Sequence, residues 1–282
     1  MKLAVIAQTG ETRTYIMAAL AVLTDCELAQ YDAEPQSLAS LFAWQPDAVL
    51  CTAAKEAEAL LASMSGSTAQ ILLAVLALPN EEETAQLNRL FEQGVRPVLP
   101  QLFAPHVTAL RQALSSPLVA EVATVNCTRK QPESGSAVAL AFQDILIACR
   151  LLGQVKEVFA QRNSGAGRDS LLLTLRMEQG GIVGLSAQTG AGSERQICYD
   201  YACRDGVVSY DSLRQPLFIH TDESKSFPGY DEDLEKAFRL AVQAALSGET
   251  EQCAALLACL SVLPLIEDSL RTGKMSTEGG AL

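Results

Sequence analysis

Side chains that could carry acid–base or metal chemistry are few in this chain. It has two histidines, His106 and His220, and neither has metal-ligand spacing. We expect His106 to lie on the surface at a helix start and His220 to be a structural residue at the end of an apolar run. The eight cysteines form no C-x-x-C pair and most lie within apolar segments. They are therefore predicted to be buried thiols in a reducing compartment, and no metal site is predicted.

A polar turn, Ala7 to Thr12, follows the first apolar run and precedes a helix-type stretch. The amino end of a helix can hold a phosphate where the backbone is accessible. Gly10 is the one glycine in this turn, and Glu11 adds a negative charge where a diphosphate would lie. Two interpretations stay open: a plain strand-to-helix turn with Thr9 or Thr12 as the N-cap, or an altered cofactor site.

A second polar pair, Gln143 and Asp144, lies within a predicted helix. Gln143 can hydrogen-bond a hydroxyl group but cannot act as a base, whereas a carboxylate such as Asp144 can take a proton. Adjacent residues on a helix point about 100° apart, so the two side chains face different directions. Asp144 is therefore either a catalytic candidate or a solvated or capping residue.

The elements that must position these residues change in kind along the chain. In the first part, apolar β-type runs at 3–6, 27–31, 48–51, 71–76 and 97–99 alternate with helix-type stretches at 12–23, 35–44 and 54–64. Another helix is predicted to open at Asn80, an N-cap residue followed by three glutamates. This β-α rhythm predicts an α/β fold, a Rossmann-like doubly wound parallel sheet with helices on both faces.

The second part contains long extended runs and three helices. Strands are predicted at 119–128, 155–162, 170–177, 181–187, 194–201 and 207–210, and helices at 137–152, 231–246 and 251–270. Gly180-Gly181 and Asp205-Gly206 are hairpin signals, and Gly153 is a predicted helix C-cap. Tyr199 and Tyr201 share one strand face, which would face a substrate or another subunit.

We thus predict two domains, a nucleotide-binding one over 1–117 and a second over 118–282. The second is an α+β domain with a large, mostly antiparallel open sheet that carries helices on one face.

The charge balance excludes two classes of partner. The chain has 21 basic and 33 acidic residues, a net charge of −12. Nucleic-acid phosphates and anionic membranes would both be repelled by such a surface. No secretory signal is visible, and no uninterrupted apolar stretch approaches the roughly 20 residues that span a bilayer. A cytoplasmic protein is expected.

The order of three local patterns resembles the Gfo/Idh/MocA family of nicotinamide-dependent sugar oxidoreductases. The segment 139–152 with Gly153 is similar to the family's active-site helix and the glycine that ends it. The run 171–175 before Gly180-Gly181 resembles its hairpin, and Ser269, Gly273 and Lys274 match the ending of its last helix. Together these patterns cover nearly the whole chain.

The resemblance implies NAD or NADP as cofactor and hydride transfer to or from a small hydroxylated or carbonyl compound. It implies that Thr9, Gly10 and Thr12 line the diphosphate, although the three glycine places of the family hold Ala7, Thr9 and Thr12 here. Asp32 follows the second strand, where an acidic residue binds the adenine ribose and favours NAD over NADP.

The family's Glu-Lys-Pro motif corresponds to Ala77, Leu78 and Pro79. Pro79 preserves the backbone turn and is expected to be a cofactor-binding residue, but Leu78 carries neither charge nor proton. The places of the family's histidine and aspartate hold Gln143 and Leu146. The usual proton carrier is therefore missing from this sequence.

Two hypotheses about function stay open. One is a divergent enzyme, with substrate near Gln143, Asp144 and Pro79. The other is a catalytically inactive member that serves as a binding or assembly module. Under either, a homo-oligomer is expected, because an open sheet must cover its free face and related proteins pair such sheets between subunits. The strands that carry Leu171, Leu173, Leu175, Ile182 and Leu185 would supply that surface.

Overall fold

The structure is a computed structural model of the 282-residue chain. It describes residues 1–7, 11–32, 34–64, 68–115, 121–190, 192, 194–214, 218–220, 225–226 and 233–277. The side chains of 11, 35, 219, 220, 225 and 226 are not described. Two compact units share this chain: unit 1 comprises Met1–Ala104 and Asp233–Ala254, and unit 2 comprises Pro105–Glu232 and Ala255–Leu282.

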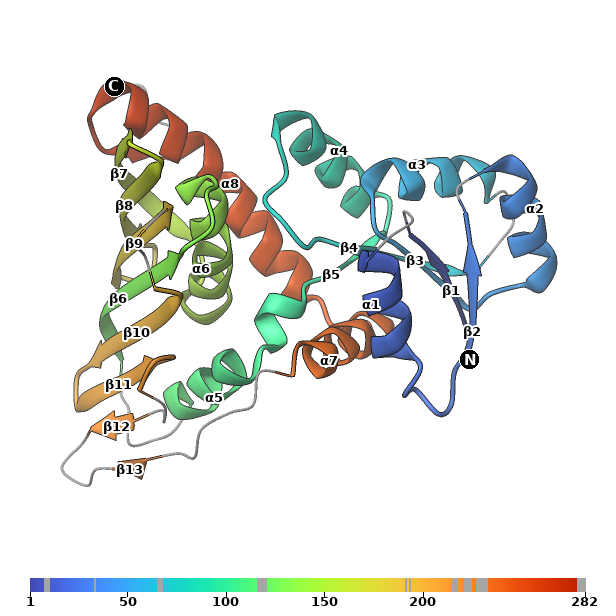
Figure 1. Cartoon of the computed structure of the whole chain (residues 1–282), viewed down its shortest axis with the longest axis horizontal. Coiled ribbons are helices and arrows are strands. Elements are labelled where there is room, and N and C mark those ends of the chain that lie inside the picture. Colours follow the sequence, from blue (N-terminus) through green and yellow to red (C-terminus); the bar gives the residue numbers. More distant parts are fainter. Residues whose placement is uncertain are drawn as a thin grey trace. The chain divides into compact units, whose positions relative to one another are not determined.

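Unit 1 contains a five-stranded parallel sheet in the order β2-β1-β3-β4-β5 (Figure 1). Its strands are β1 (Lys2–Ile6), β2 (Glu27–Tyr31), β3 (Ala48–Cys51), β4 (Gln70–Ala74) and β5 (Arg96–Val98). Its helices are α1 (Glu11–Leu20), α2 (Pro35–Trp44), α3 (Ala54–Ser63), α4 (Glu81–Glu92), α7 (Leu234–Ser247) and the short 3-10 helix η1 (Pro100–Phe103). The Rossmann-like fold predicted from the β-α rhythm is confirmed.

Both faces of this sheet are covered, as the apolar strands require. On one face, Leu3, Val5 and Leu50 pack with Ile16 of α1 and Phe238 of α7 in one buried core. Helices α2, α3 and α4 lie on the other side of the sheet (Figure 1).

The compact units divide the chain differently from the predicted boundary at residue 117. Helix α7 belongs to unit 1 because its apolar face completes the core over the parallel sheet. Helix α5 (Pro105–Leu114) belongs to unit 2 because it packs on β11. The functional division at 117 stays a prediction.

Unit 2 is built on a nine-stranded sheet in the order β13-β12-β11-β10-β6-β9-β8-β7-β14. Its strands are β6 (Val122–Gln131), β7 (Val155–Gly165), β8 (Arg168–Met177), β9 (Ile182–Gly190), β10 (Gln196–Cys203), β11 (Gly206–Asp211), β12 (Phe218–His220), β13 (Lys225–Ser226) and β14 (Ser276–Thr277). The pairs are antiparallel except β6 with β9, which is parallel, so the mostly antiparallel sheet is confirmed.

Helices cover one face of this sheet. Helix α6 (Ala137–Leu152) packs on β6, β8 and β9, and Cys259 of α8 (Glu251–Thr272) contacts the Phe142 carbonyl of α6. Leu171, Leu173, Leu175 and Leu185 are buried on this face. They therefore cannot supply the free surface expected of them, and of the five residues named for that surface only Ile182 is exposed, at 46%. The strand alternation sends Leu172, 53% exposed, to the free face as well.

Asp169 of β8 ties the start of α6 to the sheet. Its carboxylate accepts hydrogen bonds from the Ala137 amide at 2.8 Å, from the Arg162 guanidinium at 2.8 and 2.9 Å, and from the Ser164 hydroxyl. The hydrogen bonds from Arg162 are the main reason that the pKa of Asp169 lies well below its usual range. The backbone at the amino end of α6 is thus satisfied by a group from the sheet.

Helix α8 is the one described helix that is long and apolar enough to cross a membrane by length and composition. It buries Leu256, Cys259 and Val262 inside unit 2. At its carboxyl end, Ser269 Oγ accepts a hydrogen bond from the Ala160 amide at 2.9 Å and donates one to the Lys274 carbonyl at 2.6 Å. The Ser-x-x-x-Gly-Lys ending therefore fixes α8 to strand β7, the neighbour of the short edge strand β14.

We predict that Gly190→Ala destabilises the protein more than Gly180→Ala. Both glycines have positive φ, +107° and +104°, so both substitutions strain the backbone. A Cβ at Gly190 would lie 2.1 Å from the Gly167 carbonyl oxygen, whereas a Cβ at Gly180 would meet nothing within 4 Å. Urea unfolding should show a loss of about 1–2 kcal/mol for Gly180→Ala and a clearly larger loss for Gly190→Ala. Equal losses would contradict the steric argument.

Candidate functional site

A pocket of about 380 Å³ opens at the carboxyl ends of β3 and β4 in unit 1. Its polar lining comes from Thr12 on α1, Thr52 after β3 and Glu83 on α4. The rest is apolar and includes Leu78 and Pro79. In open α/β sheets, ligands bind outside the carboxyl ends of the strands, next to the point where the strand order reverses. Here that point lies between β1 and β3, so the pocket is in the expected place.

The amino end of α3 is closed by the chain's own carboxylate. Glu56 Oε2 accepts hydrogen bonds from the amides of Thr52 and Ala53, both at 3.0 Å. Glu56 is 4% exposed although it is charged. Its burial is explained by these bonds and by the favourable interaction of a carboxylate with a helix amino end.

The amino end of α4 is closed in the same way. Glu83 Oε2 accepts from the Asn80 amide at 3.0 Å, and Asn80 Oδ1 accepts from the Glu83 amide at 2.9 Å. This reciprocal pair is a capping box, and it confirms Asn80 as the N-cap. The Asn-x-x-Glu spacing in the sequence was the signal for it, whereas the role of Glu56 had no comparable signal.

Asp32 lies directly after β2, as the sequence predicts. Its carboxylate pairs with Arg13 Nη1 at 3.3 Å and its amide donates to Ser37 Oγ at 2.9 Å. The Asp32 side chain is 59% exposed and so can still accept hydrogen bonds from a ribose.

The predicted cofactor residues thus fall into three groups. Thr12 and Pro79 line one pocket, and Asp32 lies past a neighbouring strand of the same sheet. Thr12 lies inside α1, so it is not the helix N-cap. Thr9 and Gly10, and with them the turn that would hold a diphosphate, lie outside the described residues.

In unit 2, Asp144 is buried in an ion pair beneath α6. Its carboxylate accepts from Arg129 Nε at 2.8 Å and Nη2 at 2.7 Å, and from the Tyr199 hydroxyl at 2.6 Å. The Asp144 side chain is fully buried and that of Arg129 is 9% exposed. Asp144 is therefore neither solvated nor a helix cap. Gln143, the next residue on α6, is half-buried.

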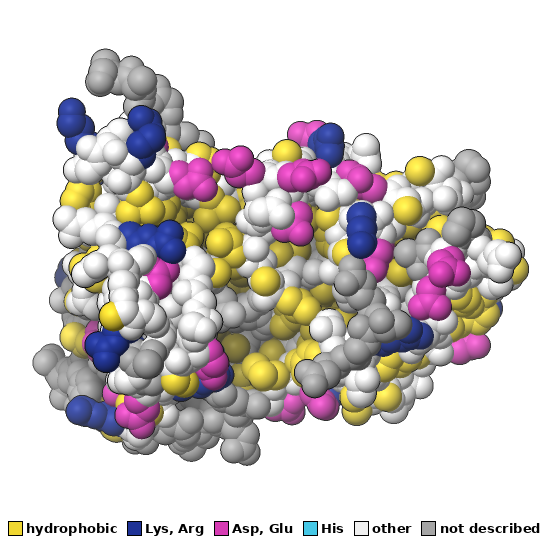
Figure 2. Space-filling view, turned by 45° about the horizontal axis from the view of Figure 1, so that its top comes forward, with side chains coloured by type: hydrophobic (Ala, Val, Ile, Leu, Met, Phe, Trp, Pro, Cys, Tyr) yellow, Lys and Arg dark blue, Asp and Glu magenta, His cyan; other side chains and the backbone are white. Residues whose placement is uncertain are grey.

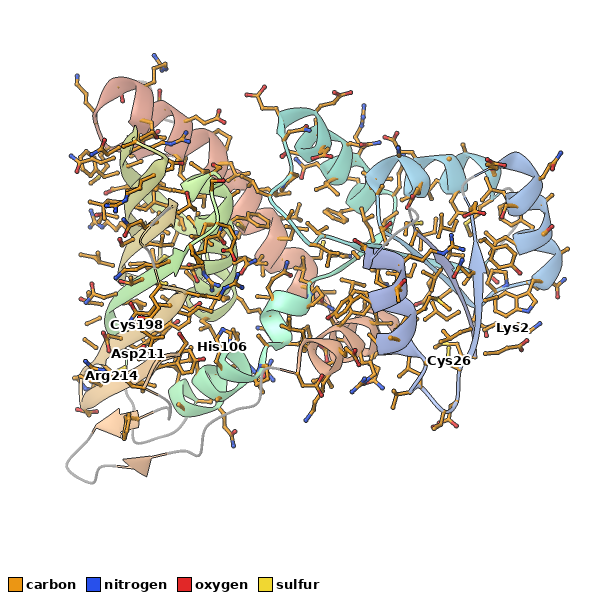
Figure 3. The ribbon with its side chains drawn as sticks, viewed as in Figure 1. Lys2, Cys26, His106, Cys198, Asp211 and Arg214 are labelled. Atoms are coloured by element: carbon orange, nitrogen blue, oxygen red, sulfur yellow. The ribbon has the colours of Figure 1, made fainter. Side chains whose placement is uncertain are left out.

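Aromatic rings extend this buried cluster. His106 of α5 stacks on Tyr210 with ring centroids 5.1 Å apart and on Tyr199 at 6.0 Å. Figure 3 shows His106 on α5 beside β10 and β11. Tyr199 and Tyr201 do share one face, but that face is the helix-covered core of unit 2. They do not form the surface toward substrate or subunit that the alternation suggested.

The surface position expected of His106 is wrong, because only 7% of the residue is exposed. Its Nε2 is buried and has no hydrogen-bond partner among the described residues. Burial lowers the pKa of His106 to about 4, and the nearby Arg129 charge adds to this effect. The imidazole is therefore neutral at physiological pH. The side chain of His220 lies outside the described residues.

Among the described residues, no three His, Cys, Asp or Glu side chains gather closely enough to hold a metal ion.

The eight cysteines are free thiols; Cys51, Cys127, Cys149 and Cys259 are buried, and the other four are half-buried. On the face shown in Figure 2, basic side chains stand singly among acidic ones.

The two-domain α/β fold is similar to that of solved structures of Gfo/Idh/MocA-type oxidoreductases, the family that the sequence resembles, and at these sequence identities the likeness shows the fold. Three solved structures illustrate it. An oxidoreductase from Agrobacterium radiobacter, in complex with NAD+, L-tartaric acid and magnesium, is 15% identical with a TM-score of 0.78, covering 100% of this chain and 99% of its own.

A myo-inositol dehydrogenase from Corynebacterium glutamicum is also 15% identical, with a TM-score of 0.77 and coverage of 100% and 99%. Biliverdin reductase from Synechocystis sp. PCC 6803, in complex with biliverdin and NADP+, is 14% identical, with a TM-score of 0.70 and coverage of 96% and 99%. No protein-family model matches the sequence. No curated protein matches it either.

We predict that Asp144→Asn lowers the free energy of unfolding by about 3–5 kcal/mol, because it leaves the buried Arg129 charge without its partner. Gln143→Ala, a change on the adjacent half-buried residue, should cost about 1 kcal/mol or less. The double variant Arg129→Met/Asp144→Leu should recover most of the lost stability. Chemical denaturation measures all three. An Asp144→Asn protein as stable as the wild type would refute the structural role of this ion pair.

Proposed function

We propose that the chain is an NAD(P)-dependent oxidoreductase-like protein that acts by hydride transfer on a small hydroxylated or carbonyl compound. The observation that supports this proposal best is the pocket past β3 and β4, beside the point where the strand order reverses. Neighbouring structures of the same fold hold NAD+ or NADP+. In this reaction an alcohol and the oxidised cofactor give a carbonyl compound, the reduced cofactor and a proton.

The described residues fit such a cofactor on both sides of the point between β1 and β3 where the strand order reverses. The exposed Asp32 carboxylate can accept hydrogen bonds from the adenine ribose and would repel a 2′-phosphate, which favours NAD. Thr12 and Thr52 offer hydroxyl groups in the pocket, and Leu78 and Pro79 offer apolar contact. The bound nicotinamide would supply hydride transfer, while these residues would position it and exclude water.

The residues proposed to act on the substrate, Gln143 and Asp144, belong to α6. Gln143 is proposed to hold a substrate hydroxyl by hydrogen bonding. Asp144 was predicted as a second site residue, and its carboxylate is committed to Arg129 and Tyr199. Because its oxygens already accept these hydrogen bonds inside the core, a proton-transfer role for Asp144 would require the pair to open.

A second candidate function is a catalytically inactive binding or assembly module. The commitment of Asp144 to a structural ion pair supports this alternative. So does the pocket lining, in which Glu83 is the one ionisable side chain among the described residues. NAD-linked turnover of a polyol or sugar that is abolished by Gln143→Ala would eliminate this alternative.

We predict that NAD(H) binds and that Ala53→Trp weakens binding at least tenfold, because Ala53 lines the pocket and an indole would fill part of it. Ala59→Trp places the same ring on an exposed position of α3, the helix that follows Ala53, and should leave the affinity unchanged. Isothermal titration calorimetry measures both, with thermal unfolding to show that the variants are folded. Absence of binding by wild-type protein at millimolar NAD(H) and NADP(H) would refute the proposed function.

We also propose that the protein is cytoplasmic and forms a homo-oligomer through the free face of the unit 2 sheet. A hollow of about 360 Å³ on that sheet is lined by neutral side chains, among them Asn126, Phe159 and Thr174. In a chain with a net charge of −12, an uncharged hollow lets two copies meet there without like-charge repulsion.

We predict that Leu172→Glu weakens self-association at least a hundredfold, since Leu172 is 53% exposed and lines this hollow. Leu257→Glu, which changes a 41% exposed leucine on α8, is the matched control and should have no such effect. Light scattering and sedimentation over a micromolar concentration range give the result. A wild-type monomer throughout that range would reject the oligomer.

A further inference from the structure

We propose that the unit 1 pocket favours the oxidised, positively charged nicotinamide ring over the reduced, neutral one, and that Glu83 is the residue responsible. This inference rests on the proposed function. It concerns which form of the cofactor the site stabilises, and hence which direction of hydride transfer binding would assist.

The position of the ring follows from the sheet. A dinucleotide on an open α/β sheet lies across the point of strand reversal, with one nucleotide on each side. Past β2, on one side of β1, lies Asp32, which suits the adenine ribose. Past β3 and β4, on the other side, lies the 380 Å³ pocket. The nicotinamide half would therefore occupy the pocket.

The charge of the pocket is negative. Glu83 is part of its lining, and no lysine, arginine or histidine is among the described lining residues. The buried carboxylate of Glu56 adds a second negative charge next to the lining residues Thr52 and Ala53. Two basic residues, Arg13 and Lys55, are next to lining residues in the sequence. Arg13 pairs with Asp32, and the exposed Lys55 is not part of the pocket lining.

The helix amino ends do not reverse this charge. A free helix amino end contributes about half a positive charge. Both α3 and α4 begin beside the pocket, and each is closed by a glutamate carboxylate: Glu56 on the amides of Thr52 and Ala53, and Glu83 on the amide of Asn80. Each carboxylate more than offsets the partial charge of its helix, which leaves a net negative field.

The difference in affinity between NAD+ and NADH measures the effect of this negative field. NAD+ and NADH share the diphosphate, both riboses and the adenine, so repulsion of the phosphates affects both equally. They differ by one positive charge on the ring. A single unit charge about 4 Å away in water changes an affinity roughly fivefold, and we expect a preference of about that size for NAD+.

Isothermal titration calorimetry of NAD+ and NADH on wild-type protein and two variants tests this proposal. Glu83→Gln removes the charge but retains a capping-box side chain, because glutamine also serves at this position. Glu82→Gln is the matched control, since Glu82 is exposed in the same first turn of α4 and is not part of the lining. We expect about fivefold tighter binding of NAD+ in wild type and Glu82→Gln, and equal binding of the two forms in Glu83→Gln.

The outcomes separate the two proposals. If neither form binds to wild-type protein, the proposed function fails. If both bind but NADH binds as tightly as NAD+ or more tightly, the charge inference fails while the proposed function stands. An unchanged preference in a folded Glu83→Gln variant would remove Glu83 as its cause. The ratio of the NAD+ and NADH affinities of the wild-type protein decides whether the preference exists, even where a variant does not fold.

Discussion

The buried ion pair between Arg129 and Asp144 is the interaction on which the second unit depends. Burying two charges costs several kcal/mol per ion, and here paired geometry with a tyrosine hydroxyl compensates for it. The pair joins β6, β10 and α6 at one point. It therefore fixes the rotation of α6 about its own axis, and that rotation determines where Gln143 points. His106 and Tyr210 stack around the same point and exclude water from it.

The first unit uses charge in a related way. Glu56 and Glu83 satisfy backbone amides at the starts of α3 and α4, where a phosphate could otherwise bind. The pocket between these helices is consequently shaped for a ligand group that is neutral or positively charged. Any diphosphate would have to be held elsewhere than at these two helix starts.

The sequence was informative where local patterns repeat. Alternating apolar strands and helices predicted the parallel sheet, and the turns at Gly180-Gly181 and Asp205-Gly206 predicted two hairpins that the strand pairing confirms. The short strands β12, β13 and β14 were not predicted, because two or three residues carry no periodicity. The burial of His106 was missed as well: a histidine beside a proline at a helix start is expected to be exposed unless its aromatic neighbours are known.

By itself, the sequence determined the fold class, the order of the elements, and the places of Asp32 and Pro79 after their strands, because these depend on local periodicity and on turn residues. Only the tertiary structure decided that Asp144 pairs with Arg129, that Leu171, Leu173 and Leu175 face the helices, and that Thr12 and Pro79 line one pocket. The physical reason is that these contacts join segments far apart in the chain. Burial and pairing depend on which surfaces meet, which local patterns leave open.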